Sequence, residues 1–297
     1  MPDRSAAAAD LRSRRALAAL ARLGRCRGRR RGRRRFARTV SRHAMPRPPA
    51  HDGVVGHPMD TRYLVNVFEL EGGLLDSTLR QHPRLRPLFS RDFAGVDRHA
   101  LRNAYLRLLR LKIEYVQYTV PALRAAGLAL RDGDDEDRRW SERLLDYAAG
   151  ETETDSGAGH HRWARNDMAA LGAARELLDA PPHPSALLYR SYFIEDARRH
   201  PYAILGAKGV LERFSIRISD DIVAGLLASG IADAERATSF FGHHGVLDIE
   251  HVRDGEGYLQ RLEQPRKRFQ VLEGAYFTSG IYRSLVDEVM PARSLRG

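Results

Sequence analysis

The sequence predicts an all-α protein, a bundle of about seven or eight helices that follows a disordered, arginine-rich leader. From about residue 60 onwards, apolar side chains recur at spacings of three and four, as on a helix that packs along one side. Runs that alternate with period two, as strands do, are not sustained. A chain of 297 residues with 43% hydrophobic residues is long enough to bury a substantial core.

The leader and the body differ in charge. Residues 1–50 carry 16 arginines and no lysine against Asp3 and Asp10, a net charge of +14. The whole chain carries +11, so residues 51–297 carry −3. The high isoelectric point therefore describes the leader, and it is no argument that the body binds nucleic acid.

We divide the chain into a disordered basic leader and linker, residues 1–58, and a helical domain, residues 59–297. The arginine block suits a solvated tail best; the alternatives are an arm for nucleic acid or a membrane surface and, more weakly, a transit peptide. Met45 and Met59 follow the arginines, so translation from either would omit the leader. The single cysteine, Cys26, excludes an intrachain disulfide.

The sequence shows neither a membrane span nor a secretory signal. The chain contains no run of 18 apolar residues, and the leader has no apolar core of the kind that a secretory signal needs. We expect a soluble cytoplasmic protein without membrane contact.

The helices are expected in a definite order. In the first clear segment, Leu101, Tyr105 and Leu108 share one side; an acidic run at 134–137 favours the start of the next. Pro181 stops a later segment. The expected helical segments are 99–118, 134–151, 162–180, 185–199, 202–218, 220–231, 240–254 and 266–289.

Three side chains able to bind a metal lie in one of these segments, FFGHHGVLDIEHVRD. His244, Asp248 and His251 are separated by four and three residues, which places them on one face of a helix. Such a trio can also be a hydrogen-bonded core group or an exposed polar stripe. Its neighbours therefore decide the interpretation.

Glu212 lies in AILGAKGVLERFSI, where most other side chains are apolar or small, so its carboxylate is expected in the interior. A buried carboxylate needs a cation, a base or a hydrogen-bond network. Lys208, four residues earlier, shares its helix face and could supply an ion pair instead. We favour the metal.

A second acid and histidine occur in GETETDSGAGHHRW. Glu153 and His160 are seven residues apart, which on a continuous helix is the same face. Two glycines between them can break that helix, so other participants stay open: Glu151, Asp155 and His161.

The candidate metal ligands come from three separate helical segments, and they are Glu153, His160, Glu212, His244, Asp248 and His251. Nitrogen and oxygen donors without thiolate favour iron or manganese over structural zinc. Helical bundles build dinuclear carboxylate sites from facing helices, and three acids can bridge two metals.

These residues, in this order, resemble the heme-oxygenase-like diiron oxidases and oxygenases, also called iron-containing redox enzymes. The family's final motif, H-x3-D-x2-H, is matched in full by His244, Asp248 and His251. Glu212 in LGAKGVLERF resembles the glutamate helix, and His160 in GHHRWARNDMAALG the histidine segment. The resemblance covers roughly residues 60–290.

The first acid matches less well. Glu153 fits the members with a seven-residue offset to the histidine, whereas others use a three-residue offset, and that position here is Gly157.

The resemblance implies a heme-oxygenase-like bundle that holds two irons, with manganese as the alternative metal. It also implies activation of O2 and oxidation of a small amino-acid-like or fatty-acid-like substrate. A substrate carboxylate could meet Arg213, Arg190 or Lys208.

Other functions stay open. Thiaminase-like enzymes and cofactorless oxidases use this scaffold without metal, although they do not need six ligands. The H-x3-D-x2-H trio argues against heme. A non-enzymatic helical protein could bind nucleic acid through the leader. Apart from the leader, no binding of nucleic acid is expected. A homodimer is left open.

Overall fold

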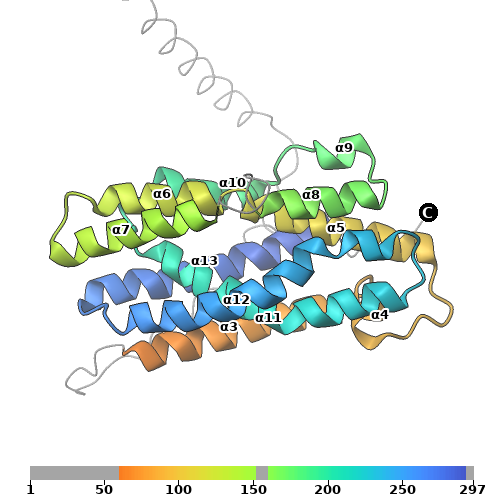
Figure 1. Cartoon of the computed structure of the whole chain (residues 1–297), viewed down its shortest axis with the longest axis horizontal. Helices are drawn as coiled ribbons and strands as arrows, with labels where there is room; N and C mark the ends of the chain where they lie inside the picture. Colours follow the sequence, from red (N-terminus) through yellow and green to blue (C-terminus); the bar gives the residue numbers. More distant parts are fainter. Residues whose placement is uncertain (1–59, 152–159, 292–297) are drawn as a thin grey trace, which may run out of the picture. The chain divides into compact units, whose positions relative to one another are not determined.

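The computed structural model describes residues 60–151 and 160–291. The chain divides into two units, 1–56 and 57–297, and every described residue belongs to the second. The leader, 1–58, therefore lies outside the described residues. All regular secondary structure in the described part is helical, which confirms the predicted all-α class (Figure 1).

Eight α-helices of ten residues or more form the described part of the domain. They are α3 (Thr61–Gln81), α5 (Arg98–Val116), α6 (Thr119–Leu130), α7 (Asp135–Gly150), α8 (His161–Ala170), α11 (Ala203–Ala228), α12 (Ser239–Leu259) and α13 (Pro265–Val289). The shorter elements are α4 (Arg86–Ser90), α9 (Arg175–Leu178), α10 (Pro184–Arg190), the π-helix η1 (Ser191–Glu195) and the 3₁₀ helix η2 (Ala234–Ala237).

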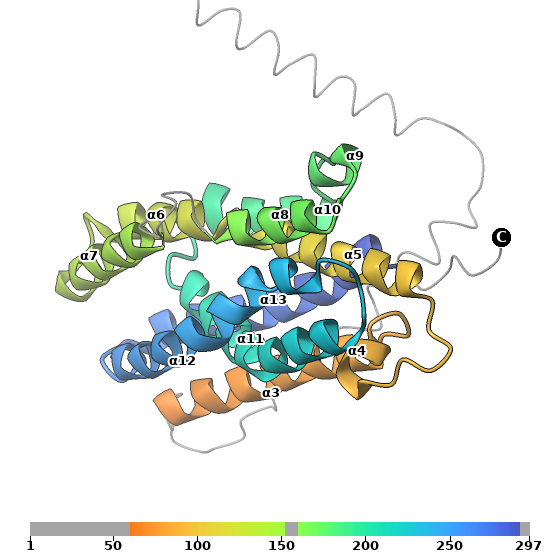
Figure 2. The ribbon, with the colours of Figure 1, turned by 45° about the vertical axis from the view of Figure 1, so that its right-hand side comes forward.

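Helix α11 is the central element, because it packs against α3, α12 and α13. Helices α6 and α7 form an antiparallel pair, and α5 packs against α8 (Figures 1 and 2). The apolar faces of these helices form one continuous buried cluster. The residues of the candidate site lie on α7, α11 and α12 and at the start of α8.

Two glycines allow α11 and α13 to approach closely. A Cβ added at Gly206 would lie 1.9 Å from the carbonyl oxygen of Val271, and one at Gly274 would lie 1.9 Å from that of Ala203. Backbone therefore packs on backbone at this crossing, and no larger side chain fits there.

The predicted segmentation was partly wrong. The expected helices 202–218 and 220–231 are one helix, α11, because no proline or glycine interrupts the sequence between them. The expected helix 162–180 ends at Ala170 instead, where Gly172 takes the left-handed conformation with φ 66°. Helices α3 and α6 were not predicted as separate elements.

The acidic start of α7 was predicted correctly. Asp134 is the N-cap, its side chain accepts a hydrogen bond from the Asp137 backbone N–H, and the Asp137 side chain accepts one from the Asp134 backbone. None of the helices in 60–151 and 160–291 is long and apolar enough to cross a bilayer.

Candidate metal centre

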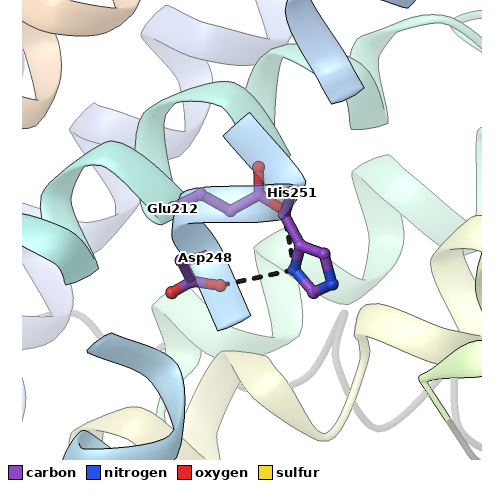
Figure 3. A group of neighbouring side chains, drawn as sticks. All are labelled: Glu212, Asp248 and His251. Atoms are coloured by element: carbon purple, nitrogen blue, oxygen red, sulfur yellow. Dashed lines mark ion pairs between the residues drawn. The ribbon is translucent and has the colours of Figure 1, made fainter. Parts of the chain in front are cut away.

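Glu212, Asp248 and His251 converge at the contact between α11 and α12 (Figure 3). One potential ligand atom from each lies within 4.8 Å of the others. His251 Nδ1 is 3.5 Å from Asp248 Oδ1 and 3.6 Å from Glu212 Oε1. Glu212 and Asp248 are buried, and His251 is half-buried. Two carboxylates and an imidazole thus share one small volume.

The three predicted residues of α12 lie on one continuous helix, as expected. His244 is one turn before Asp248, and its Nδ1 is 2.8 Å from the carbonyl oxygen of Phe240. A carbonyl oxygen only accepts hydrogen bonds, so Nδ1 carries the proton and Nε2 keeps its lone pair. Burial lowers the pKa of His244 to about 4, which keeps the ring neutral as metal binding requires.

His160, the N-cap residue of α8, lies beside His244 with the ring centroids 4.9 Å apart. Its Nδ1 is 3.0 Å from Oε2 of Glu151, the residue that follows α7, and both side chains are buried. A carboxylate that contacts Nδ1 fixes the ring and leaves Nε2 for another partner. Burial also lowers the pKa of His160.

Asp248 acts electrostatically on each histidine of the group. Its charge raises the pKa of each neighbouring imidazole, although at His160 and His244 burial outweighs it and the pKa is lowered. At His251 burial also lowers the pKa, but the hydrogen bond with Asp248 and the charge of Glu212 have the larger combined effect, so the pKa is raised. Asp248 therefore lies within electrostatic reach of all three histidines.

Glu212 has neutralising partners within the protein. Lys208 Nζ lies 2.6 Å from Glu212 Oε1, so the ion pair that the sequence left open is present. The Tyr147 hydroxyl, on α7, is 3.1 Å from the same oxygen and 3.0 Å from His251 Nδ1. Both contacts of Glu212 involve Oε1, the oxygen that also lies 3.6 Å from His251 Nδ1. Burial still raises the pKa of Glu212.

Sequence reasoning did not identify Tyr147. Its hydroxyl bridges Glu212 and His251, and Lys208 Nζ lies 4.1 Å from its ring centroid. The available signal was spacing, because Tyr147 precedes Glu151 by one helical turn and shares its face. Burial raises the pKa of Tyr147, so the phenol keeps its proton.

A cavity of ≈ 80 Å³ borders the cluster. Its polar lining residues are Lys112, Thr119, Tyr147, Glu151, His160, Lys208, Glu212, His244, Asp248 and Ser215, and the other lining residues are apolar or aromatic. A second cavity of ≈ 120 Å³ shares Tyr147, Lys208 and Glu212 with the first and also reaches His251. The acids and imidazoles therefore face space in which a small molecule can lie.

The structure brings together five of the six predicted ligands, which are His160, Glu212, His244, Asp248 and His251. The sixth, Glu153, lies outside the described residues, as does its alternative Asp155. Glu151, another of the alternatives, contacts His160. This mixture of neutral imidazoles and carboxylates is the donor set that first-row divalent metals such as iron and manganese take.

Comparison with known proteins gives a family and a fold. Residues 113–280 match the family described as iron-containing redox enzyme, and this range includes every candidate ligand. No curated protein matches the chain.

Two solved structures are similar to the chain. One is a domain of unknown function with a heme oxygenase-like fold from Shewanella denitrificans OS217, at 17% identity and a TM-score of 0.60 over 76% of this chain and 91% of that one. The other is a CADD-like protein of unknown function from Nostoc punctiforme PCC 73102, at 18% identity and a TM-score of 0.49 over 75% and 96%. The first carries the fold assignment.

Proposed function

We propose, since the chain belongs to the iron-containing redox enzyme family, that it is a non-heme diiron oxygenase or oxidase that uses O2 to oxidise a small organic substrate. The observation that carries the proposal is the meeting of Glu212, Asp248 and His251, with Glu212 and Asp248 lining the same cavity as His244 and His160. Such a set of neutral imidazoles and buried acids is suited to two divalent cations.

Five described residues would hold the metals: His160, Glu212, His244, Asp248 and His251. Asp248 acts electrostatically on all three histidines, which suits a carboxylate ligand of the metal site. We keep Glu153 as the sixth ligand from its sequence position. Glu151 would not bind a metal itself. Its contact with His160 Nδ1 would orient the imidazole ring and leave Nε2 for the metal.

The bound irons would supply electrons to O2, and the protein would supply position, charge and protons. Lys208 and the Tyr147 hydroxyl both contact Oε1 of Glu212, the oxygen that lies 3.6 Å from His251 Nδ1, and so fix the carboxylate beside the cluster. The Tyr147 proton lies between Glu212 and His251, which is a place where a proton can be held or passed on. The apolar wall of the cavity would exclude water from the substrate.

The test is anaerobic loading with Fe(II), followed by rapid mixing with O2. The wild-type protein should take up about two irons per chain, consume O2 and show a transient visible absorption band. His251→Ala should take up less iron and show no band. A wild-type protein that takes up no iron and consumes no O2 would refute the proposal.

The sixth ligand can be tested with a pair of variants. Glu153→Gln should lose one iron per chain, because a ligand is removed. Glu151→Gln should keep two irons at about 10- to 100-fold weaker affinity, which is the usual effect of removing an outer hydrogen-bond partner. The reverse result in anaerobic Fe(II) titrations would make Glu151 the ligand.

A metal-free enzyme on the same scaffold is the second candidate, and one observation favours it. The 2.6 Å ion pair with Lys208 already gives Glu212 a counter-charge without any metal. This alternative predicts activity that survives a chelator, whereas the diiron proposal predicts that chelation abolishes it. Nucleic-acid binding through the leader, cytoplasmic location and homodimerisation remain predictions from the sequence.

A further inference from the structure

Lys112 is a lysine of α5 whose side chain is buried in the domain, with only 2% of the residue exposed. Four aromatic rings surround its ammonium group. The distances from Nζ to the ring centroids are 4.4 Å for Phe214, 5.1 Å for Tyr282, 5.5 Å for Phe241 and 5.9 Å for Tyr115. Ring faces attract a cation, but they do not replace a hydrogen-bonded anion.

No carboxylate of 60–151 or 160–291 forms an ion pair with Lys112. Asp248 acts on it only through space, and burial prevails and lowers the pKa of Lys112 to about 7. A buried ammonium without an ion pair opposes folding, so a well-packed apolar side chain would stabilise the protein more. Such a group calls for a functional explanation.

The cations that the sequence suggested for a substrate carboxylate are already engaged. Arg213 pairs with Glu69 at 3.0 Å and also with Glu256. Arg190 pairs with Glu195 at 3.1 Å, and Lys208 pairs with Glu212 at 2.6 Å. None of the three is available to a substrate without breaking an existing ion pair.

Lys112 and Lys208 are the lysines that line the site cavity, and no arginine of the described residues lines it. Lys112 thus faces the same space as Glu212, His244 and Asp248, and no described carboxylate forms an ion pair with it. We propose that Lys112 binds the carboxylate of the substrate in this cavity. This inference rests on the proposed function, because it takes the cavity beside the cluster to be the substrate pocket.

The chemistry of the wall favours a small organic monocarboxylate. One ammonium balances one negative charge, and the hydroxyls of Thr119 and Ser215 also line the cavity. A phosphate would bring a second negative charge next to Glu212 and Asp248, and the other lysine of the lining, Lys208, is already paired with Glu212. The apolar part of the wall, which includes Leu123, suits the hydrocarbon part of the molecule.

The test compares hexanoate with its neutral analogue hexanamide by titration calorimetry. Wild-type protein should bind hexanoate about 10-fold or more tightly than hexanamide, because a hydrogen bond to a charged group is worth about 1.5–3 kcal/mol. Lys112→Met should lose this preference and keep its affinity for hexanamide. Arg190→Gln, which changes an exposed cation, should retain the wild-type preference.

Folding is checked separately, and Lys112→Met should melt at or above the wild-type temperature. Lys112→Gln, which also lacks the charge, provides a second variant with the same expected loss. If wild type shows no preference for hexanoate, or if both variants keep it, the inference is wrong.

Fe(II) titration of the same samples separates this inference from the proposed function. Iron uptake without a hexanoate preference would overturn only the role of Lys112. A hexanoate preference that depends on Lys112 without iron uptake would support that role and overturn the diiron proposal.

Discussion

Two buried aspartates, Asp167 and Asp248, differ in what their carboxylates contact. Asp167, on α8, accepts hydrogen bonds from the backbone N–H groups of Ser239 at 3.2 Å and Phe240 at 2.8 Å, where α12 begins. It thereby caps the helix that carries three candidate ligands. Asp248 faces other acids and histidines. Asp167 therefore stabilises the fold, and Asp248 belongs to the candidate site.

Replacing the two aspartates should therefore have opposite effects. Asp167→Asn should lower the free energy of unfolding by about 1–3 kcal/mol, because a buried cap is weakened. Asp248→Asn should leave it unchanged or raise it, because one of several clustered acids loses its charge, while iron uptake falls. Urea unfolding and Fe(II) titration measure the two effects. Strong unfolding of Asp248→Asn would show that this carboxylate is structural.

Lys112 should make stability depend on pH in a specific direction. Its pKa is about 7 in the folded protein against 10.5 in the unfolded chain, so between these values the unfolded chain binds more protons. The contribution of Lys112 to the free energy of unfolding thus rises with pH, by at most about 1.4 kcal/mol per pH unit. Below pH 7 both states are protonated and this dependence disappears.

The comparison with Lys112→Met isolates this effect. The variant should exceed wild type in stability most strongly at pH 6–7, and the difference should shrink as the pH approaches 9–10. Urea unfolding of both proteins across this range measures it. A difference that does not change with pH would mean that Lys112 keeps its proton in the folded protein.

Single-residue reasoning predicted the candidate ligands because their spacing follows the helix repeat. His244, Asp248 and His251 needed only that α12 be continuous, and it is. The sequence could not show which cationic side chain near the site lacks an ion pair. Arg213 and Lys208 find acids on their own or neighbouring helices, and Lys112 finds aromatic rings, which only side-chain packing determines.

At the scale of helices, the crossing of α11 and α13 depends on the glycines at its contact. Gly274→Ala should destabilise the protein by about 1–3 kcal/mol, because its Cβ would overlap the backbone carbonyl of Ala203, which cannot move independently. Gly280→Ala on the same helix is the matched control, because nothing lies within 4 Å of its Cβ position.

Gly280→Ala should stabilise the protein by up to about 1 kcal/mol, since alanine favours the helix. Thermal or urea unfolding of the two variants measures the contrast. If both variants change the free energy of unfolding equally, α11 and α13 can move apart without loss of stability. Since α11 carries Glu212, iron affinity should fall in Gly274→Ala alone.

Helix boundaries were predictable where the signal is local. The acidic cap of α7 consists of neighbouring residues, and α13 begins at a proline, so both helix starts have a local signal in the sequence. The division of α11 into two segments was wrong because periodicity does not show whether a polar position such as Ser219 is buried within a longer helix. Ser219 is fully buried in that helix.

At the scale of the molecule, metal binding should stabilise the fold. Glu212 and Asp248 repel each other in a buried volume, and each raises the folding cost of the other. Anaerobic Fe(II) should therefore raise the melting temperature of wild type, and the rise should grow with metal concentration. A chelator should reverse it, and His251→Ala should show little of it. If Fe(II) does not change the melting temperature of wild type, there is no metal site at this cluster.

The sequence by itself determined the helical class and the residue types of the site, because helix periodicity and ligand chemistry are local properties of the chain. It also carried the match to the iron-containing redox enzymes. Tertiary structure alone decided that α7, α8, α11 and α12 meet at one cavity, that Tyr147 bridges Glu212 and His251, and that Lys112 faces the same space without an ion pair. The contact between Tyr147 and His251 joins residues 104 positions apart, and contacts of this kind depend on how helices pack.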